Sequence, residues 1–122
     1  MLIENAIQSA LAIRDAEFPE SIMLQWLSSH DGQAWTNVCS QYADAGEKPI
    51  YNEDTDTQAT ELLIPSPWDD IYIDYLVMRI DLENGDIDRY NNGAALYASK
   101  RADWANWYNR THKWKQKTEI ML

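Results

Sequence analysis

The sequence predicts an all-α protein, a small helical bundle of about four helices with one long middle loop. Apolar residues recur at steps of three and four along most of the chain, and only four glycines and four prolines interrupt them. A chain of 122 residues fits one domain of limited interior volume. We expect a single domain at 1–112, with helices at about 2–15, 20–42, 67–83 and 86–112, and a C-terminal extension at 113–122.

The first two helices are indicated by their apolar faces. These faces consist of Ile3, Ile7 and Ala10 in the first helix, and of Met23, Leu27, Ala34 and Val38 in the second. The first helix should end before Pro19, because the residue ahead of a proline avoids the helical region. Gly32 is a weak point in the second helix, which we nevertheless expect to be continuous.

Residues 43–65 lack helical periodicity and hold the acidic run "NEDTDT" and the apolar run "ELLIP". A long irregular connection is unusual in a compact domain. One interpretation is a solvated loop. The other is an arm with a short strand near 61–64 that pairs with a neighbouring subunit through Leu62, Leu63 and Ile64.

The third helix has a clear start signal and an apolar body. Ser66 is a candidate cap and Pro67 suits the first helical position, with two aspartates after them near the positive end of the helix dipole. Residues 71–82 are apolar on nearly every side, which is typical of a helix buried all round. We expect another copy of the protein to complete that burial.

The fourth helix carries two stripes and forms an antiparallel hairpin with the third. The bulky stripe is Ile87, Tyr90, Ala94, Tyr97, Arg101, Trp104 and Tyr108, and the small stripe is Asn91, Ala95, Ala98, Ala102 and Ala105. Small side chains let another backbone approach closely. We expect subunit contacts at Leu62, Leu63, Ile64, Tyr97, Ala98, Arg101, Ala102, Trp104, Ala105 and Tyr108.

The net charge is −10, with 20 acids and 10 bases. This balance excludes general affinity for duplex DNA or for anionic membranes, which need an excess of lysine and arginine. Residues 100–122 hold six bases and two acids, a net +4, so residues 1–99 carry −14. No apolar run reaches the roughly 18 residues of a membrane span.

Catalytic and metal motifs are not evident. Ser29, His30 and Asp31 are the residue types of a catalytic triad, but neighbours on a helix diverge by about 100° each, so we read His30 as a polar boundary residue. The acids around Gly85 do not have calcium-loop spacing, and no nucleotide-binding, hydrolase or zinc-protease motif occurs. Cys39 has no second cysteine to pair with and is expected in the core. We expect no enzyme, no metal and no cofactor.

The C-terminal half resembles a known family. The motifs are "LLIPSPWDDIYIDYL", the turn "NGDIDRYNN" and the closing "WYNRTH", and the resemblance covers about residues 60–112. They resemble head-tail connector, or adaptor, proteins of tailed phages that infect Gram-positive hosts. The resemblance implies a structural subunit of a dodecameric ring in the virion, at the head-tail interface, assembled in the host cytoplasm.

The same resemblance implies partners. They are the portal protein and the next tail-side connector or stopper protein, and DNA passes through the ring without sequence-specific binding. We expect portal contacts at Lys113, Trp114, Lys115, Lys117, Ile120, Met121 and Leu122. We expect a channel lining that repels phosphate among Glu53, Asp54, Asp56, Asp81, Glu83, Asp86 and Asp88. The alternative is an acidic inhibitor that mimics DNA and blocks a host enzyme.

Overall fold

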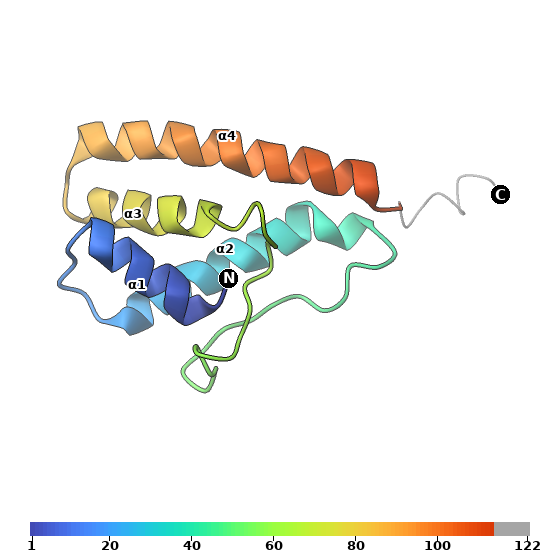
Figure 1. Ribbon diagram of the computed structural model, residues 1–122, viewed down its shortest axis with the longest axis horizontal. Helices are drawn as coiled ribbons and strands as arrows, with labels where there is room; N and C mark the ends of the chain where they lie inside the picture. Colours follow the sequence, from blue (N-terminus) through green and yellow to red (C-terminus); the bar gives the residue numbers. More distant parts are fainter. Residues whose placement is uncertain (114–122) are drawn as a thin grey trace.

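The computed structural model describes residues 1–113 and confirms an all-α bundle. The described residues form α1 (Ile3–Ile13), α2 (Glu20–Asn37), the short 3₁₀ helix η1 (Cys39–Gln41), α3 (Ile71–Glu83) and α4 (Ile87–Thr111). α3 and α4 run antiparallel as a hairpin, as expected (Figure 1). The second helix continues through Gly32, which is buried, and changes to a 3₁₀ turn only after Val38.

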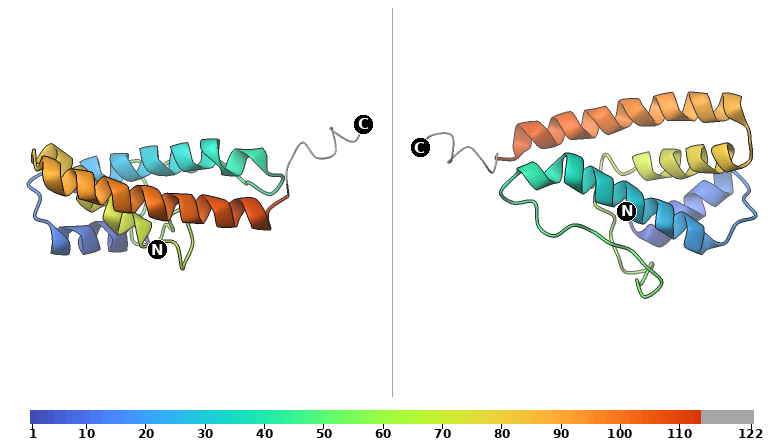
Figure 2. Two further views of the ribbon diagram at one scale, coloured as in Figure 1. Left: turned by 90° about the horizontal axis from the view of Figure 1, so that it is seen from above. Right: turned by 180° about the vertical axis from the view of Figure 1, so that it is seen from behind.

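α3 is the central helix of the bundle. It contacts α1, α2 and α4, and the views in Figure 2 show these helices on different sides of it. Its buried residues are Ile71, Tyr72, Tyr75, Leu76, Met78, Ile80 and Asp81. A single chain therefore buries most of the apolar surface of this helix, although Leu82 stays 39% exposed. That another copy covers the remainder stays a prediction.

α3 begins at Ile71, four residues after the predicted start. The segment before it makes successive tight turns, in which the Trp68 N–H donates to the Pro65 carbonyl at 2.9 Å and the Ile71 N–H donates to the Trp68 carbonyl at 3.3 Å. The Ser66–Pro67 peptide is cis. The serine and proline thus mark the turn that leads into the helix.

The long loop between η1 and α3 packs on its own chain. The N–H groups of Ile3 and Glu4 donate to the carbonyls of Thr60 (3.1 Å) and Thr57 (2.9 Å), so the loop supplies acceptors that the first turn of α1 lacks. The strand expected near 61–64 is a single antiparallel bridge between Leu2 and Glu61.

The apolar run of the loop is part of the core. Leu62 and Ile64 are buried in their own chain, and Leu63 is half-buried against it. The assignment of Leu62 and Ile64 as anchors for a neighbouring subunit is corrected accordingly, because a side chain enclosed by its own bundle has no surface to offer. The assignment of Leu63 stays a prediction. Tyr51 is buried as well, so the loop is not simply solvated.

Candidate functional site

The bulky stripe of α4 faces its own bundle from Tyr90 onward, whereas Ile87 is exposed. Trp104 is fully buried. The ring of Tyr97 lies 5.4 Å from that of Tyr75, and the ring of Tyr108 lies 5.2 Å from that of Tyr42. Burial raises the pKa of Tyr97 to about 12, against a smaller opposing effect of the nearby Arg101. These stripe residues, which the sequence placed at a subunit interface, stabilise the monomer.

The small stripe of α4 faces solvent. Its exposed members and their neighbours are Asn91, Asn92, Ala95, Ala98, Ser99, Ala102, Asp103 and Asn106, which we call the outer face of α4, while Ala105 is half-buried. Leu96 lies at its edge and is 49% exposed. Side chains of this size allow a second helix to approach closely, since the distance between packed helices depends on the residues at the contact.

Two cations beside this face, Lys100 and Arg101, are engaged with the chain itself. Lys100 Nζ lies 2.6 Å from Asp74 Oδ2 and 2.9 Å from Asp70 Oδ2, which ties α4 to the start of α3. Hydrogen bonds to Asp74 and then Asp70 raise the pKa of Lys100 despite some burial. The Arg101 guanidinium lies 5.1 Å from the Trp104 ring centroid. Residues 91–99 carry no charged side chain.

One of the expected channel acids is not at the surface. Asp81 is buried and its Oδ1 lies 2.7 Å from Arg14 Nε, so it holds α1 against α3. The hydrogen bond to Asp81 is the main reason that the pKa of Arg14 is raised. Asp81 therefore cannot line a channel, and that assignment is wrong.

The remaining acids of that set form two groups. Glu83, Asp86 and Asp88 lie around the α3–α4 turn, where Asp86 caps α4 by accepting from the Arg89 N–H at 3.2 Å. The exposed run 53–56 lies at the tip of the long loop, at a different corner of the molecule (Figure 1).

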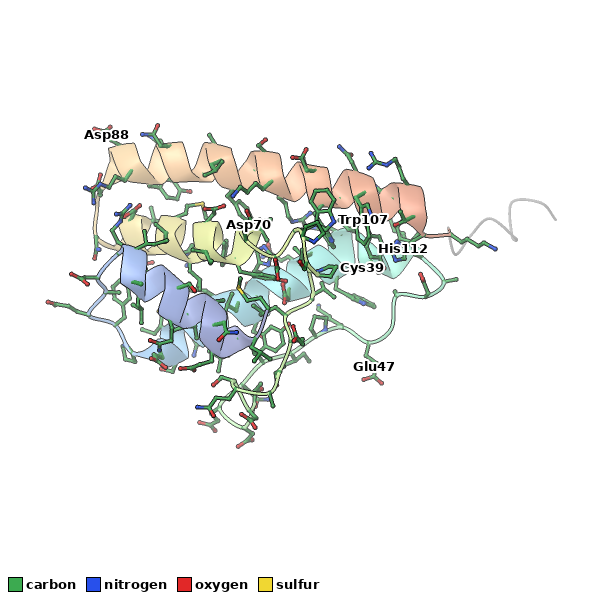
Figure 3. All side chains as sticks on the ribbon, in the orientation of Figure 1. Cys39, Glu47, Asp70, Asp88, Trp107 and His112 are labelled. Carbon is green, nitrogen blue, oxygen red and sulfur yellow. The ribbon has the colours of Figure 1, made fainter. Side chains whose placement is uncertain are left out.

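The C-terminal end of α4 is fixed to the chain that follows α2. The ring of His112 stacks on Tyr108 with centroids 3.6 Å apart, and its Nε2 lies 3.8 Å from Asp44 Oδ2 (Figure 3). The Tyr42 hydroxyl donates to Asn109, and the Ala43 N–H donates to the Lys113 carbonyl at 3.2 Å.

This contact fixes the point from which the C-terminal segment, residues 113–122, departs. Lys113 is exposed at that point. The other expected portal contacts, Trp114, Lys115, Lys117, Ile120, Met121 and Leu122, lie outside the described residues.

A buried polar cluster around Asp31 was not anticipated from the sequence. Its carboxylate accepts from the hydroxyls of Tyr51 and Tyr72 and from the Leu63 N–H, and it lies 3.0 Å from His30 Nδ1. Burial, together with the Asp31 charge, raises the pKa of both tyrosines, which keeps their hydroxyls protonated as donors. The cluster joins α2, the long loop and α3.

This cluster is enclosed in the bundle. His30 is buried, not at the boundary as expected, and its ring lies 4.6 Å from that of Tyr75. Ser29 is exposed and is not part of the cluster. A signal was available, because positions 30 and 31 lie between Leu27 and Ala34 on the apolar face of this helix.

The chemistry available elsewhere in the described part of the chain is limited. No group of three or more histidine, cysteine or acidic side chains there could hold a metal ion. A hollow of about 610 Å³ between α2 and residues 48–51 is lined mainly by serine, threonine and amide side chains. Cys39 is buried, and burial raises the pKa of its thiol. Within residues 1–113 no helix combines the length and apolarity that crossing a bilayer requires.

Comparison of the chain with protein-family models, with curated proteins and with solved structures gave no significant match in any of the three.

Proposed function

We propose that this chain is a structural building block, a head-tail connector subunit that assembles as a ring below the portal of a tailed phage and extends the DNA channel. The proposal starts from the resemblance of residues 60–112 to that family. The observation that carries it in the structure is the outer face of α4, an uncovered helix surface of mainly small, uncharged side chains with one acid, Asp103.

The motifs that carry the resemblance have structural positions, as expected for a protein that assembles rather than catalyses. Leu62 and Ile64 of "LLIPSPW" are in the core, and Gly85 of "NGDI" makes the α3–α4 turn with a φ of +75°. Trp107, Tyr108 and His112 of "WYNRTH" form the aromatic contacts that fix the end of α4. These residues shape the hairpin that presents the outer face of α4.

The outer face is the surface we assign to contacts between copies. α4 is about 37 Å long at 1.5 Å per residue, and Trp104 is its one fully buried residue in the described chain. Figure 2 shows the helix along the outside of the bundle. A neighbouring helix packed along Ala95 and Ala98 would bury surface in a stretch without charged side chains, and desolvating a charge is the costly step in association.

The test is assembly of the full chain, alone and co-expressed with the portal protein encoded in the same genome. Light scattering after size exclusion and negative-stain electron microscopy report the assembly. We expect rings, with or without the portal as template. The double substitution Ala98→Arg/Ala102→Arg should abolish them, because two long cations then occupy the contact.

Gln33→Arg is the matched control, since Gln33 is also exposed on a helix but lies on α2. It should assemble as the unmodified protein does, and circular dichroism should show equal helix content in all three proteins. A chain that stays monomeric and fails to bind the portal contradicts the proposed function. Ring formation by the double arginine variant contradicts the assignment of the outer face.

A further inference from the structure

Large apolar side chains are exposed together at one end of the bundle. They are Ile13 (56% exposed), Leu82 (39%), Ile87 (54%) and Leu96 (49%). α1 and α3 end there and α4 begins there, on the left of Figure 1. Ile50, in the long loop, is the one other large apolar residue exposed in the described chain. A concentration of this kind marks an interaction site, whereas single exposed apolar residues are ordinary.

A hollow lies at this end between three helices. Its volume is about 290 Å³, and its apolar lining comes from Ile13 on α1, Val77 and Met78 on α3, and Leu96 on α4. Gly93 also lines it, and an added Cβ there would lie 3.5 Å from Met78 Cβ. The volume is at the lower limit of small-molecule pockets, about 300 Å³, and suits inserted aliphatic side chains.

Acidic side chains are in excess at this end of the bundle. The two arginines of this end are already paired, Arg14 with Asp81 and Arg89 with Asp86. Four exposed acids make no ion pair within residues 1–113, and these are Asp15, Glu17, Glu83 and Asp88. We call this surface, with the four exposed apolar residues and the hollow, the acidic apolar end.

The opposite end of the molecule has complementary chemistry. Arg110 and Lys113 are exposed there and are in no ion pair with the described residues. The sequence continues with Lys115 and Lys117 and ends with the apolar triplet at 120–122. Residues 113–122 hold three lysines and one acid, Glu119, so their net positive charge and their aliphatic triplet are complementary to an acidic, apolar surface.

We propose that the acidic apolar end binds the C-terminal segment of a second copy of this chain, with the aliphatic triplet in the hollow and the lysines against the acids. Such a contact joins two different surfaces, so it propagates head to tail and closes into a ring when the rotation allows. It deepens the proposed function by naming a contact between copies in addition to the outer face of α4, and it gives the C-terminal segment a partner other than the portal.

The distances along the chain favour a second copy, rather than the same chain, as the source of the C-terminal segment that enters the hollow. Leu96 lies about 22 Å back along α4 from Thr111, at 1.5 Å per residue. Ile120 follows Lys113 by seven residue-to-residue steps, which span at most about 25 Å when the chain is fully extended. The segment would have to retrace α4 almost fully stretched to reach its own hollow, whereas a neighbour can present it without that constraint.

The test is site-directed cross-linking of the full chain. Protein with Leu96→Cys is mixed with protein with Ile120→Cys, and a short bismaleimide joins thiols that lie close together. Cys39 is buried in both and stays unmodified. A covalent dimer of the two variants can arise only between copies. Ile50→Cys replaces Leu96→Cys in the control, because Ile50 is equally apolar and more exposed, at 70%, but lies away from the acidic apolar end.

We expect at least tenfold more dimer with Leu96→Cys than with Ile50→Cys. Adding Glu83→Lys/Asp88→Lys to the Leu96→Cys protein should reduce the yield severalfold. Equal yields from the two positions overturn the inference, as does a cross-link that forms only within one chain carrying both cysteines. The two proposals fail separately. If rings form but this cross-link does not, the connector function is retained and the contact is refuted. If the cross-link forms but the chain does not bind the portal, the contact is retained and the connector function is refuted.

Discussion

The hydroxyl of Tyr72 on α3 donates a 2.7 Å hydrogen bond to Asp31 Oδ1 on α2, inside the bundle. The same hydroxyl accepts from the Ile64 N–H at 2.7 Å. One buried phenol therefore joins two helices and the long loop. An interior carboxylate is stable only when its oxygens are well supplied with donors, and Asp31 has two tyrosine hydroxyls and a backbone N–H.

The first prediction concerns Asp31→Asn. The amide keeps the shape of the carboxylate but turns one oxygen into a donor that faces other donors, so at least one buried hydrogen bond is lost. We expect the free energy of unfolding to fall by about 2–4 kcal/mol, as when a buried charged group loses its partners. Urea denaturation followed by circular dichroism measures it.

The control for that prediction is Asp88→Asn, which makes the same change on an exposed residue of α4. It should alter the free energy of unfolding by less than about 0.5 kcal/mol. Equal effects of the two substitutions would show that the Asp31 cluster adds nothing to stability.

The second prediction concerns the pair between Arg14 and Asp81. Arg14→Met leaves a buried carboxylate without its cation. We expect the free energy of unfolding to fall by about 2–3 kcal/mol. This is less than the roughly 3–5 kcal/mol lost when a fully buried pair is broken, because Arg14 is partly exposed. The double variant Arg14→Met/Asp81→Leu should be more stable than Arg14→Met alone, since the uncompensated charge is gone.

Arg89→Met is the comparison for this pair, because Arg89 and Asp86 are a 3.4 Å pair with both side chains exposed. Arg89→Met should lower the free energy of unfolding by less than about 1 kcal/mol. A double variant at 14 and 81 that is no more stable than Arg14→Met would refute the idea that the unpaired carboxylate causes the loss.

The third prediction concerns alkaline pH. Burial raises the pKa of Tyr51 and Tyr72, with help from the Asp31 charge, and raises that of Tyr97 to about 12. Unfolded tyrosines lose their protons near pH 10. Between about pH 10 and 12 the unfolded chain therefore holds fewer protons than the folded chain, and stability falls as pH rises.

Below about pH 10 this contribution is fully present. Urea denaturation at a series of pH values measures the slope, and absorbance of tyrosinate should rise together with unfolding. Tyr72→Phe should be less stable at neutral pH but show a shallower fall above about pH 10, because one linked proton is removed. A stability that is constant from pH 10 to 12 contradicts the prediction.

The sequence was informative where one physical signal dominated. Apolar periodicity and Pro19 predicted the bounds of α1, α2 and α4 to within a few residues. The exception is the end of α2, where a 3₁₀ turn takes the place of the last predicted helical residues. The sequence could not predict whether the apolar surface of α3 is covered by its own chain or by a second copy of the protein, because that depends on how α1 and α2 cross α3. Ser66 and Pro67 misled because the same residues suit both a helix start and a tight turn.

The candidate surfaces were harder to anticipate. Both stripes of α4 were recognised, but periodicity alone does not tell which stripe faces inward, and the bulky one does. The position of Asp81 among other acids near the α3–α4 turn suggested exposure, whereas its partner Arg14 is distant in sequence and near in space. The gathering of Ile13 with Leu96 likewise depends on the crossing of α1 and the hairpin.

The fourth prediction compares two glycines. Gly93 is inside α4, and an added Cβ would make an ordinary contact with Met78. Gly93→Ala should raise the free energy of unfolding by about 0.5–1 kcal/mol, because glycine loses more backbone entropy in a helix. Gly85 has open space around it but a φ of +75°. Gly85→Ala should therefore lower the free energy of unfolding by about 1 kcal/mol or more, because an alanine is strained at that φ. Thermal and urea denaturation of both variants decide the matter, and a stabilising Gly85→Ala would mean that the α3–α4 turn differs from the one described.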